Sequence, residues 1–184
     1  MSSYSIAVFL HVVGALGLFA ALGLEWAGVR NLRSAVTLGQ AREWTKLLRG
    51  VRWVEGPSLL ILLATGFYAS AAIGGGRPWI GLGVLGLLMI AALGWLLTGR
   101  RMRRIDGVVT AHDGSMTSAL ARQLADPVLT LSAWLRTALA LGIVFIMSTK
   151  PDRAGAFTAL GIALALGLAA GLPPFVRRTQ PHGA

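Results

Sequence analysis

Residues 6–24 read IAVFLHVVGALGLFAALGL, and this stretch decides the fold class of the chain. About 20 consecutive apolar residues are needed for one helix to cross a bilayer, and the only ionisable residue in this run is His11. Four further apolar runs follow, so the sequence predicts an all-α polytopic membrane helix bundle with five transmembrane helices. The predicted spans cover about residues 5–29, 54–73, 78–99, 127–149 and 154–173 of a single integral membrane domain, residues 1–184.

The composition agrees with a chain that is solvated by lipid. Of its 184 residues, 55% are hydrophobic and only 13% are charged, whereas a soluble domain carries about 25% charged residues. Because Met1–Ser5 contains no Lys or Arg, we expect the first apolar run to be a mature span and not a signal peptide. The chain contains no cysteine, which excludes disulfides, thiolate metal sites and c-type haem attachment.

The net charge of +10 comes from the loops between apolar runs, so it indicates membrane topology and not a nucleic-acid partner. Thirteen basic residues fall on one predicted side: Arg30, Arg33, Arg42, Lys46, Arg49, Arg52, Arg100, Arg101, Arg103, Arg104, Arg122, Arg177 and Arg178. The other side holds three: Arg77, Lys150 and Arg153. The positive-inside rule therefore predicts a bacterial inner-membrane protein with its N-terminus outside and its C-terminus in the cytoplasm. The basic loops should face anionic lipids.

Both predicted cytoplasmic loops contain helical patterns. In residues 38–51 apolar side chains recur at helical spacing beside a basic stripe. This segment is either an amphipathic helix on the inner leaflet or an extension of the neighbouring spans. In the second loop, Asp106-Gly107 and Asp113-Gly114 predict turns. A short helix over about residues 115–125 should follow them.

His11 is the first candidate for a functional site, because an ionisable residue inside a span is costly and tends to face the bundle interior. Gly14, one turn further on, leaves space that a flat macrocycle or a second helix could fill. Neutral imidazole is a ligand of haem iron and of copper. At the same predicted depth, Met147 or Lys150 could supply a second axial ligand and Tyr68 a hydrogen bond. The alternative is a histidine that only bonds a neighbouring helix.

The second candidate is a cluster of charges deeper in the predicted bundle. Arg136 lies inside the fourth span, where an unpaired arginine is expensive. Glu25 and Glu55 are predicted at a similar depth in the first and second spans. We expect the three side chains to form a structural ion cluster that ties three helices together. The functional alternative is a proton or cation path.

Three segments carry a resemblance to known proteins. They are FLHVVGALGLFAALG (residues 9–23), GPSLLILLATGFYAS (residues 56–70) and LRTALALGIVFIMSTKP (residues 135–151). In these segments the chain resembles an uncharacterised bacterial family of predicted integral membrane proteins. More distantly, its first span is similar to HemJ-type protoporphyrinogen oxidases and CopD-type copper proteins.

The HemJ-type resemblance implies a b-type haem held by His11. That family also uses a lysine in its third span, and residues 78–99 contain none. The CopD-type resemblance implies further His and Met ligands on the outer side, where Met147 is the one candidate.

Three classes of function remain open at the level of the sequence. The chain is a haem-binding redox protein with His11 as an axial ligand, a small proton-linked transporter component, or a structural or assembly subunit of a membrane complex. The sequence contains no complete catalytic motif that decides whether it is an enzyme. We expect it to form a homo-oligomer or to join partner chains in the membrane.

Overall fold

The computed structural model describes residues 2–72, 74, 76–111 and 114–172. Within this part the chain is all-α and contains no strand. Its five helical segments are long and apolar enough to cross a membrane: Ser3–Arg33, Leu38–Ala72, Pro78–Ala111, Ser118–Thr149 and Arg153–Gly171. The predicted five-helix membrane bundle is confirmed for the described residues.

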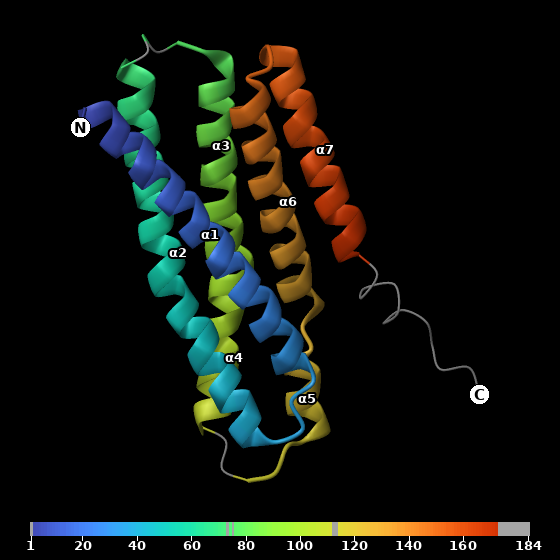
Figure 1. Cartoon of the computed structure of the whole chain (residues 1–184). Helices are drawn as coiled ribbons and strands as arrows, with labels where there is room; N and C mark the ends of the chain where they lie inside the picture. Colours follow the sequence, from blue (N-terminus) through green and yellow to red (C-terminus); the bar gives the residue numbers. More distant parts are fainter. Residues whose placement is uncertain (1, 73, 75, 112–113, 173–184) are drawn as a thin grey trace.

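Eight elements make up these segments (Figure 1). They are α1 (Ser3–Arg33), α2 (Leu38–Ala72), α3 (Pro78–Leu93), the π-helical segment η1 (Gly94–Gly99), α4 (Arg100–Ala111), α5 (Ser118–Leu124), α6 (Pro127–Thr149) and α7 (Arg153–Gly171). α6 begins at a proline that follows an aspartate. The carboxylate of Asp126 accepts a hydrogen bond from Val128 N at 2.9 Å, and Pro127 occupies the first turn, where no backbone donor is needed.

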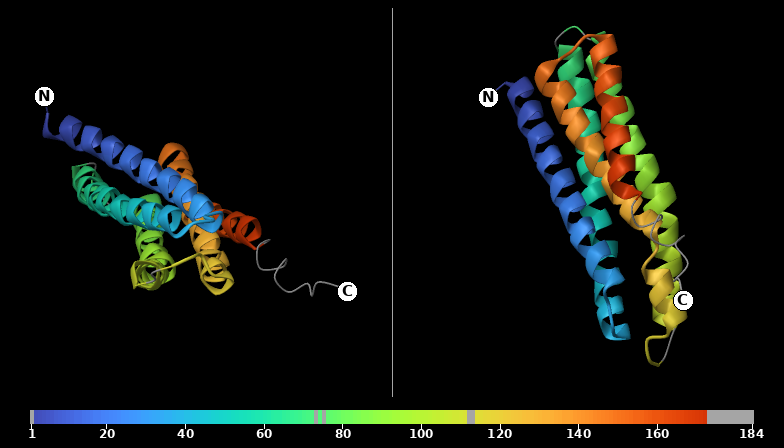
Figure 2. Two further views of the ribbon diagram at one scale, coloured as in Figure 1. Left: turned by 90° about the horizontal axis from the view of Figure 1, so that it is seen from below. Right: turned by 90° about the vertical axis from the view of Figure 1, so that its right-hand side faces the viewer.

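The helices pack mainly in two antiparallel pairs, with α1 and α2 tilted relative to α3 (Figure 2). α1 lies along α2 on one side of the bundle, and α7 lies on the outside of α6 (Figures 1 and 2). α6 also contacts α3 and α1, so it joins the two pairs. The rings of Trp26 and Trp134 meet edge to face with centroids 4.7 Å apart, which strengthens the contact between α1 and α6.

Two apolar clusters fill the interior. The first lies in the half of the bundle that contains the start of α1 and includes Leu18, Leu62 and Leu139. The second lies toward the arginine-rich end and includes Leu32 and Leu129. We call this second half, with α4 and α5, the basic end.

The structure decides between the two readings of residues 38–51. They form the first turns of α2, which is continuous to Ala72, so the segment extends a span and is not a separate surface helix. The predicted turn at Asp106-Gly107 is wrong, because both residues lie within α4. Burial of Met102, Ile105 and Val109 at helical spacing holds α4 together and outweighs the local turn preference.

The remaining loop predictions are met in part. The short helix expected over residues 115–125 is α5, whose first turn is capped by Thr117 through Leu120 N at 3.2 Å. Asp113, Ile73, Pro173, the other two histidines and the tail arginines Arg177 and Arg178 lie outside the described residues.

Close approach of α6 and α7 depends on glycine. A Cβ added at Gly167 would lie 2.9 Å from the backbone Cα of Leu135 and 3.2 Å from Cβ of Ala138. A Cβ at Gly161, on the same helix, would meet nothing within 4 Å. The two positions therefore form a matched pair that tests this helix contact.

We expect Gly167→Ala to destabilise the protein by about 1–3 kcal/mol, because overpacking against backbone cannot relax cheaply. Gly161→Ala should be neutral or stabilising by up to about 1 kcal/mol, since alanine is the better helix former. Thermal unfolding of the purified protein in detergent measures both. Equal midpoints for the two variants would show that α7 does not pack on α6 in this way.

Candidate functional site

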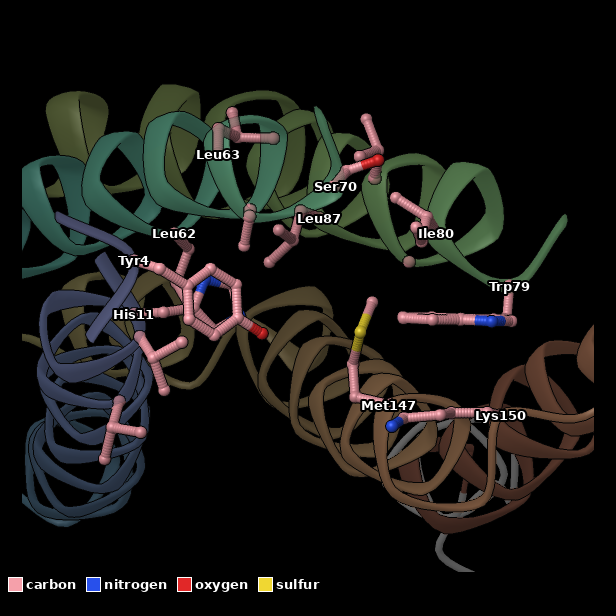
Figure 3. Close-up of a pocket in the computed structure, with 16 residues that line it drawn as sticks. Tyr4, His11, Leu62, Leu63, Ser70, Trp79, Ile80, Leu87, Met147 and Lys150 are labelled. Carbon is pink, nitrogen blue, oxygen red and sulfur yellow. The ribbon is translucent and has the colours of Figure 1, made fainter. Parts of the chain in front are cut away.

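A pocket of about 260 Å³ lies between α1, α2, α3 and α6, near the start of α1 (Figure 3). We call it the His11 pocket. Tyr4 and His11 line it from α1, Trp79 comes from the start of α3, and Met147 and Lys150 come from the end of α6. The rest of its wall is mostly apolar. The structure thus brings together three of the residues predicted to bind a cofactor: His11, Met147 and Lys150.

A hydrogen-bond chain orients the imidazole of His11. Its Nδ1 lies 3.0 Å from Thr65 Oγ1, and the Thr65 hydroxyl donates to the carbonyl oxygen of Ile61 at 2.5 Å. Because the hydroxyl donates its only proton to the carbonyl oxygen of Ile61, its oxygen accepts the hydrogen bond from His11, so Nδ1 carries the imidazole proton. Nε2 of the neutral ring is then an unprotonated base. This is the tautomer that a metal-binding histidine needs, with its other nitrogen held by a partner.

The opposite wall of the pocket carries a thioether and an ammonium group. A Cβ at Gly83 would collide with Cε of Met147, so the missing side chain there makes room for the thioether. Nζ of Lys150 lies 6.0 Å from the ring centroid of Trp79, within reach of a cation–π interaction. Figure 3 shows Tyr4 and His11 on one side of the space and Met147, Trp79 and Lys150 on the other.

Two predicted cofactor residues do not line the pocket. Tyr68 is 48% exposed and is not among the residues that line it. Gly14 is buried against α2, and a Cβ there would lie 3.1 Å from Cγ2 of Ile61. Of the two alternatives for the space beside Gly14, the second helix is therefore the one that fills it.

Sequence reasoning missed Thr65 and Tyr4. Thr65 had a usable signal, because it lies in the ATG segment (residues 64–66) that carries part of the family resemblance. Gly66 follows it, and a Cβ there would lie 3.4 Å from Cε1 of His11. Tyr4 had no signal, since a tyrosine at the end of a span is a common interfacial anchor.

The three charges predicted to pair deeper in the bundle do meet. Nη1 of Arg136 donates to both carboxylate oxygens of Glu25, at 2.8 and 2.6 Å, and Nη2 donates to Oε1 of Glu55. The side chain of Arg136 is 1% exposed and Glu25 is 2% exposed. The ion pairs join α6 to α1 and α2. The cluster lies between the two apolar clusters.

Neutral groups complete this ion cluster. The hydroxyl of Thr98, in η1, donates at 3.1 Å to Oε1 of Glu25 and lies 2.9 Å from the hydroxyl of Ser132. A Cβ at Gly94 would lie 3.1 Å from Cζ of Arg136, so the π-helical segment rests its bare backbone against the guanidinium. Thr98 and Ser132 were not predicted.

A cavity of about 20 Å³ adjoins the cluster and is lined by Glu25, Arg52 and Glu55 among others. It has room for about one water molecule. Among the described residues, Nε of Arg136 and Nη2 of Arg52 are buried without a hydrogen-bond partner. An ordered water is the simplest way to satisfy such groups.

Within the described residues, no group of three His, Cys, Asp or Glu side chains could hold a metal ion. A metal at His11 would therefore draw its other ligands from Met147, from Lys150 or from a macrocycle. Known proteins add no further guide, because the chain matches no family model, no curated protein and no solved structure at a significant level.

The ion cluster makes a prediction about stability. Arg136→Ala leaves two carboxylates without their cation, one of them fully buried, and should cost about 3–5 kcal/mol and much of the folded yield. The triple variant Glu25→Gln, Glu55→Gln, Arg136→Met removes every charge and should recover most of that loss. Folded yield and thermal unfolding in detergent measure both.

Arg49→Ala is the control, because its ion pair with Asp106 lies at the surface and contributes little. If Arg136→Ala unfolds no more easily than Arg49→Ala, the cluster is not what holds the three helices. If the triple variant stays as unstable as Arg136→Ala, the charges have a role beyond neutralising one another.

Proposed function

We propose that this chain is an integral membrane redox protein that binds a b-type haem through His11. The observation that supports this most directly is the hydrogen bond between Thr65 and Nδ1 of His11, which leaves Nε2 available to a metal. The same histidine lines a mostly apolar pocket. A histidine that only joined two helices would need no cavity beside it.

The chemical types of the side chains around the pocket are suited to a haem. His11 and Met147 would hold the haem iron, since imidazole and thioether are the ligand types found in cytochromes c. Lys150, also at the pocket, offers a cation for the carboxylates at the edge of the macrocycle. Copper is a poorer fit, because the described part of the pocket offers one imidazole and one thioether.

The size of the pocket limits how a haem is held. Pockets that bury a whole ligand usually measure about 300–1,000 Å³, and this one measures about 260 Å³. It would enclose the part of the macrocycle nearest His11 and leave the rest outside. Such exposure suits a group that exchanges electrons with a partner at the membrane.

A haem in this site would supply one-electron chemistry, and the protein would tune it. The hydroxyl oxygen of Thr65 would accept a hydrogen bond from Nδ1–H of His11 and so fix the orientation of the ring. The apolar wall would lower the local dielectric and limit access of water, which shifts the reduction potential of a haem.

The transporter alternative finds less support. Buried leucines, among them Leu18, Leu22 and Leu62, lie between His11 and the ion cluster. A proton path from one to the other would need water or polar groups through this layer. The charges of the cluster are also paired with one another, as expected for a structural role.

The test of the proposed function is an optical spectrum of the detergent-purified protein from haem-replete cells, first oxidised and then reduced with dithionite. We expect a Soret band with α and β peaks after reduction, and their loss in His11→Ala. Thr65→Val should weaken haem binding by about 10–100-fold, the usual effect of losing the partner of a ligating histidine.

Tyr68→Phe is the matched control, since Tyr68 lies near the same end of the bundle but outside the pocket. It should retain the full spectrum. A folded, colourless wild-type protein would overturn the haem assignment. A spectrum that persists in His11→Ala would move the haem elsewhere.

We further propose that the chain lies in a bacterial inner membrane with the start of α1 outside and the basic end in the cytoplasm. The concentration of arginine at one end supports this through the positive-inside rule. Because the chain has no cysteine, single cysteines can report each end.

We expect Ser3→Cys to react with a membrane-impermeant maleimide in intact cells. Thr110→Cys, exposed at the end of α4, should react only after the cells are permeabilised. Labelling in the reverse pattern would invert the proposed topology without changing the fold.

A further inference from the structure

A second cleft, of about 590 Å³, lies at the basic end between α4 and the α5–α6 junction. We call it the arginine cleft. Four arginines line it, and they come from two elements: Arg100, Arg101 and Arg104 from α4, and Arg122 from α5. It lies at the opposite end of the bundle from the His11 pocket and shares no lining residue with it.

The cleft has an excess of positive charge. Asp126 is the only carboxylate that lines it among the described residues. That carboxylate is already engaged, because one oxygen pairs with Nε of Arg101 at 2.8 Å and the other caps α6 through Val128 N at 2.9 Å. Arg100 and Arg104 remain in excess of the Arg101–Asp126 pair, so the described lining of the cleft is electropositive and favours an anion.

The position of the cleft relative to the apolar part of the bundle points to the source of that anion. Leu96, in η1, lines the cleft. Leu85 and Leu88, about two to three turns earlier in the same continuous helix, are exposed, and helical spacing places them near the face of Leu96. Beside them Trp95 is 58% exposed, and the guanidinium of Arg100 lies over its ring at 4.9 Å. An exposed tryptophan next to arginine is typical of the interface between lipid tails and headgroups.

We propose that the arginine cleft binds the phosphate headgroup of an anionic phospholipid, with the acyl chains along the exposed face of α3. Guanidinium groups bind phosphate oxygens through paired hydrogen bonds, so several arginines in one cleft suit a phosphodiester. A soluble phosphate ester would use the same guanidinium groups but would gain nothing from the apolar face. The lipid therefore makes contacts that the soluble anion cannot.

The experiment is lipid binding to the detergent-purified full chain, followed by native mass spectrometry, with phosphatidylglycerol as the probe. Phosphatidylcholine tests the need for net negative charge, and glycerol 3-phosphate tests the need for the acyl chains. Arg100→Gln/Arg104→Gln removes two charges from the cleft. Arg103→Gln/Lys46→Gln removes two charges from the same end outside it.

We expect the wild type and the Arg103/Lys46 control to prefer phosphatidylglycerol to phosphatidylcholine. The Arg100/Arg104 variant should bind phosphatidylglycerol about 30-fold more weakly, because it loses two of the arginines that attract the anionic headgroup. Arg100→Lys/Arg104→Lys keeps the charge and should recover part of the affinity, which separates loss of binding from loss of folding.

Three results would overturn the proposal. Equal binding of phosphatidylglycerol by the two double glutamine variants would show only a general attraction to a basic surface. Equal binding of the two lipids by the wild type would show that the headgroup charge is not recognised. Binding of glycerol 3-phosphate as tightly as phosphatidylglycerol would make the cleft a site for a soluble phosphate ester.

Discussion

The fold depends on the neutralisation of one buried guanidinium. Arg136 is 1% exposed in the interior of an apolar bundle, where an unpaired charge would cost several kcal/mol. No single neighbouring helix meets its hydrogen-bonding capacity. Glu25 and Glu55 come from two different helices, and Gly94 brings the backbone of a third against the guanidinium. Formation of the cluster therefore fixes how α1, α2, η1 and α6 are rotated about their axes.

That rotation also determines where His11 points. His11 and Glu25 are fourteen residues apart on α1, close to a whole number of helical turns, so they share a face. When Glu25 turns inward to meet Arg136, His11 turns inward to meet Thr65 on α2. The pocket at one end is thus a geometric consequence of the ion cluster. The residues between them on this face, such as Gly14 and Leu18, are buried against neighbouring helices.

Features that follow from the free-energy cost of burying polar groups could be predicted from the sequence. Features that depend on tertiary packing could not. The five spans follow from run length, and the meeting of Arg136 with two glutamates follows from the cost of burying a charge. Tyr68 was predicted to join the site but does not line the pocket, because whether a side chain faces a pocket depends on helix rotation, which a predicted depth does not give. A turn was predicted at Asp106 because the Asp-Gly pair has a local turn preference, whereas the packing of α4 makes the segment helical. Thr98 was not predicted because burying a hydroxyl in a membrane helix costs little free energy, so its presence in a span does not indicate a partner.

The apolar layer between the two polar sites bears on the kind of chemistry the bundle can perform. Protons cross a membrane through connected water or polar side chains, and in this layer the buried leucines Leu18, Leu22 and Leu62 are accompanied by the single hydroxyl of Ser58, which already donates to the carbonyl oxygen of Val54. Electrons need no such chain, since a redox group near the surface can exchange them with a partner that approaches it. A site near one end of a bundle with a mostly apolar middle layer therefore suits electron transfer better than coupled proton transport. On this argument the ion cluster serves the proposed site at His11 by holding the helices in place.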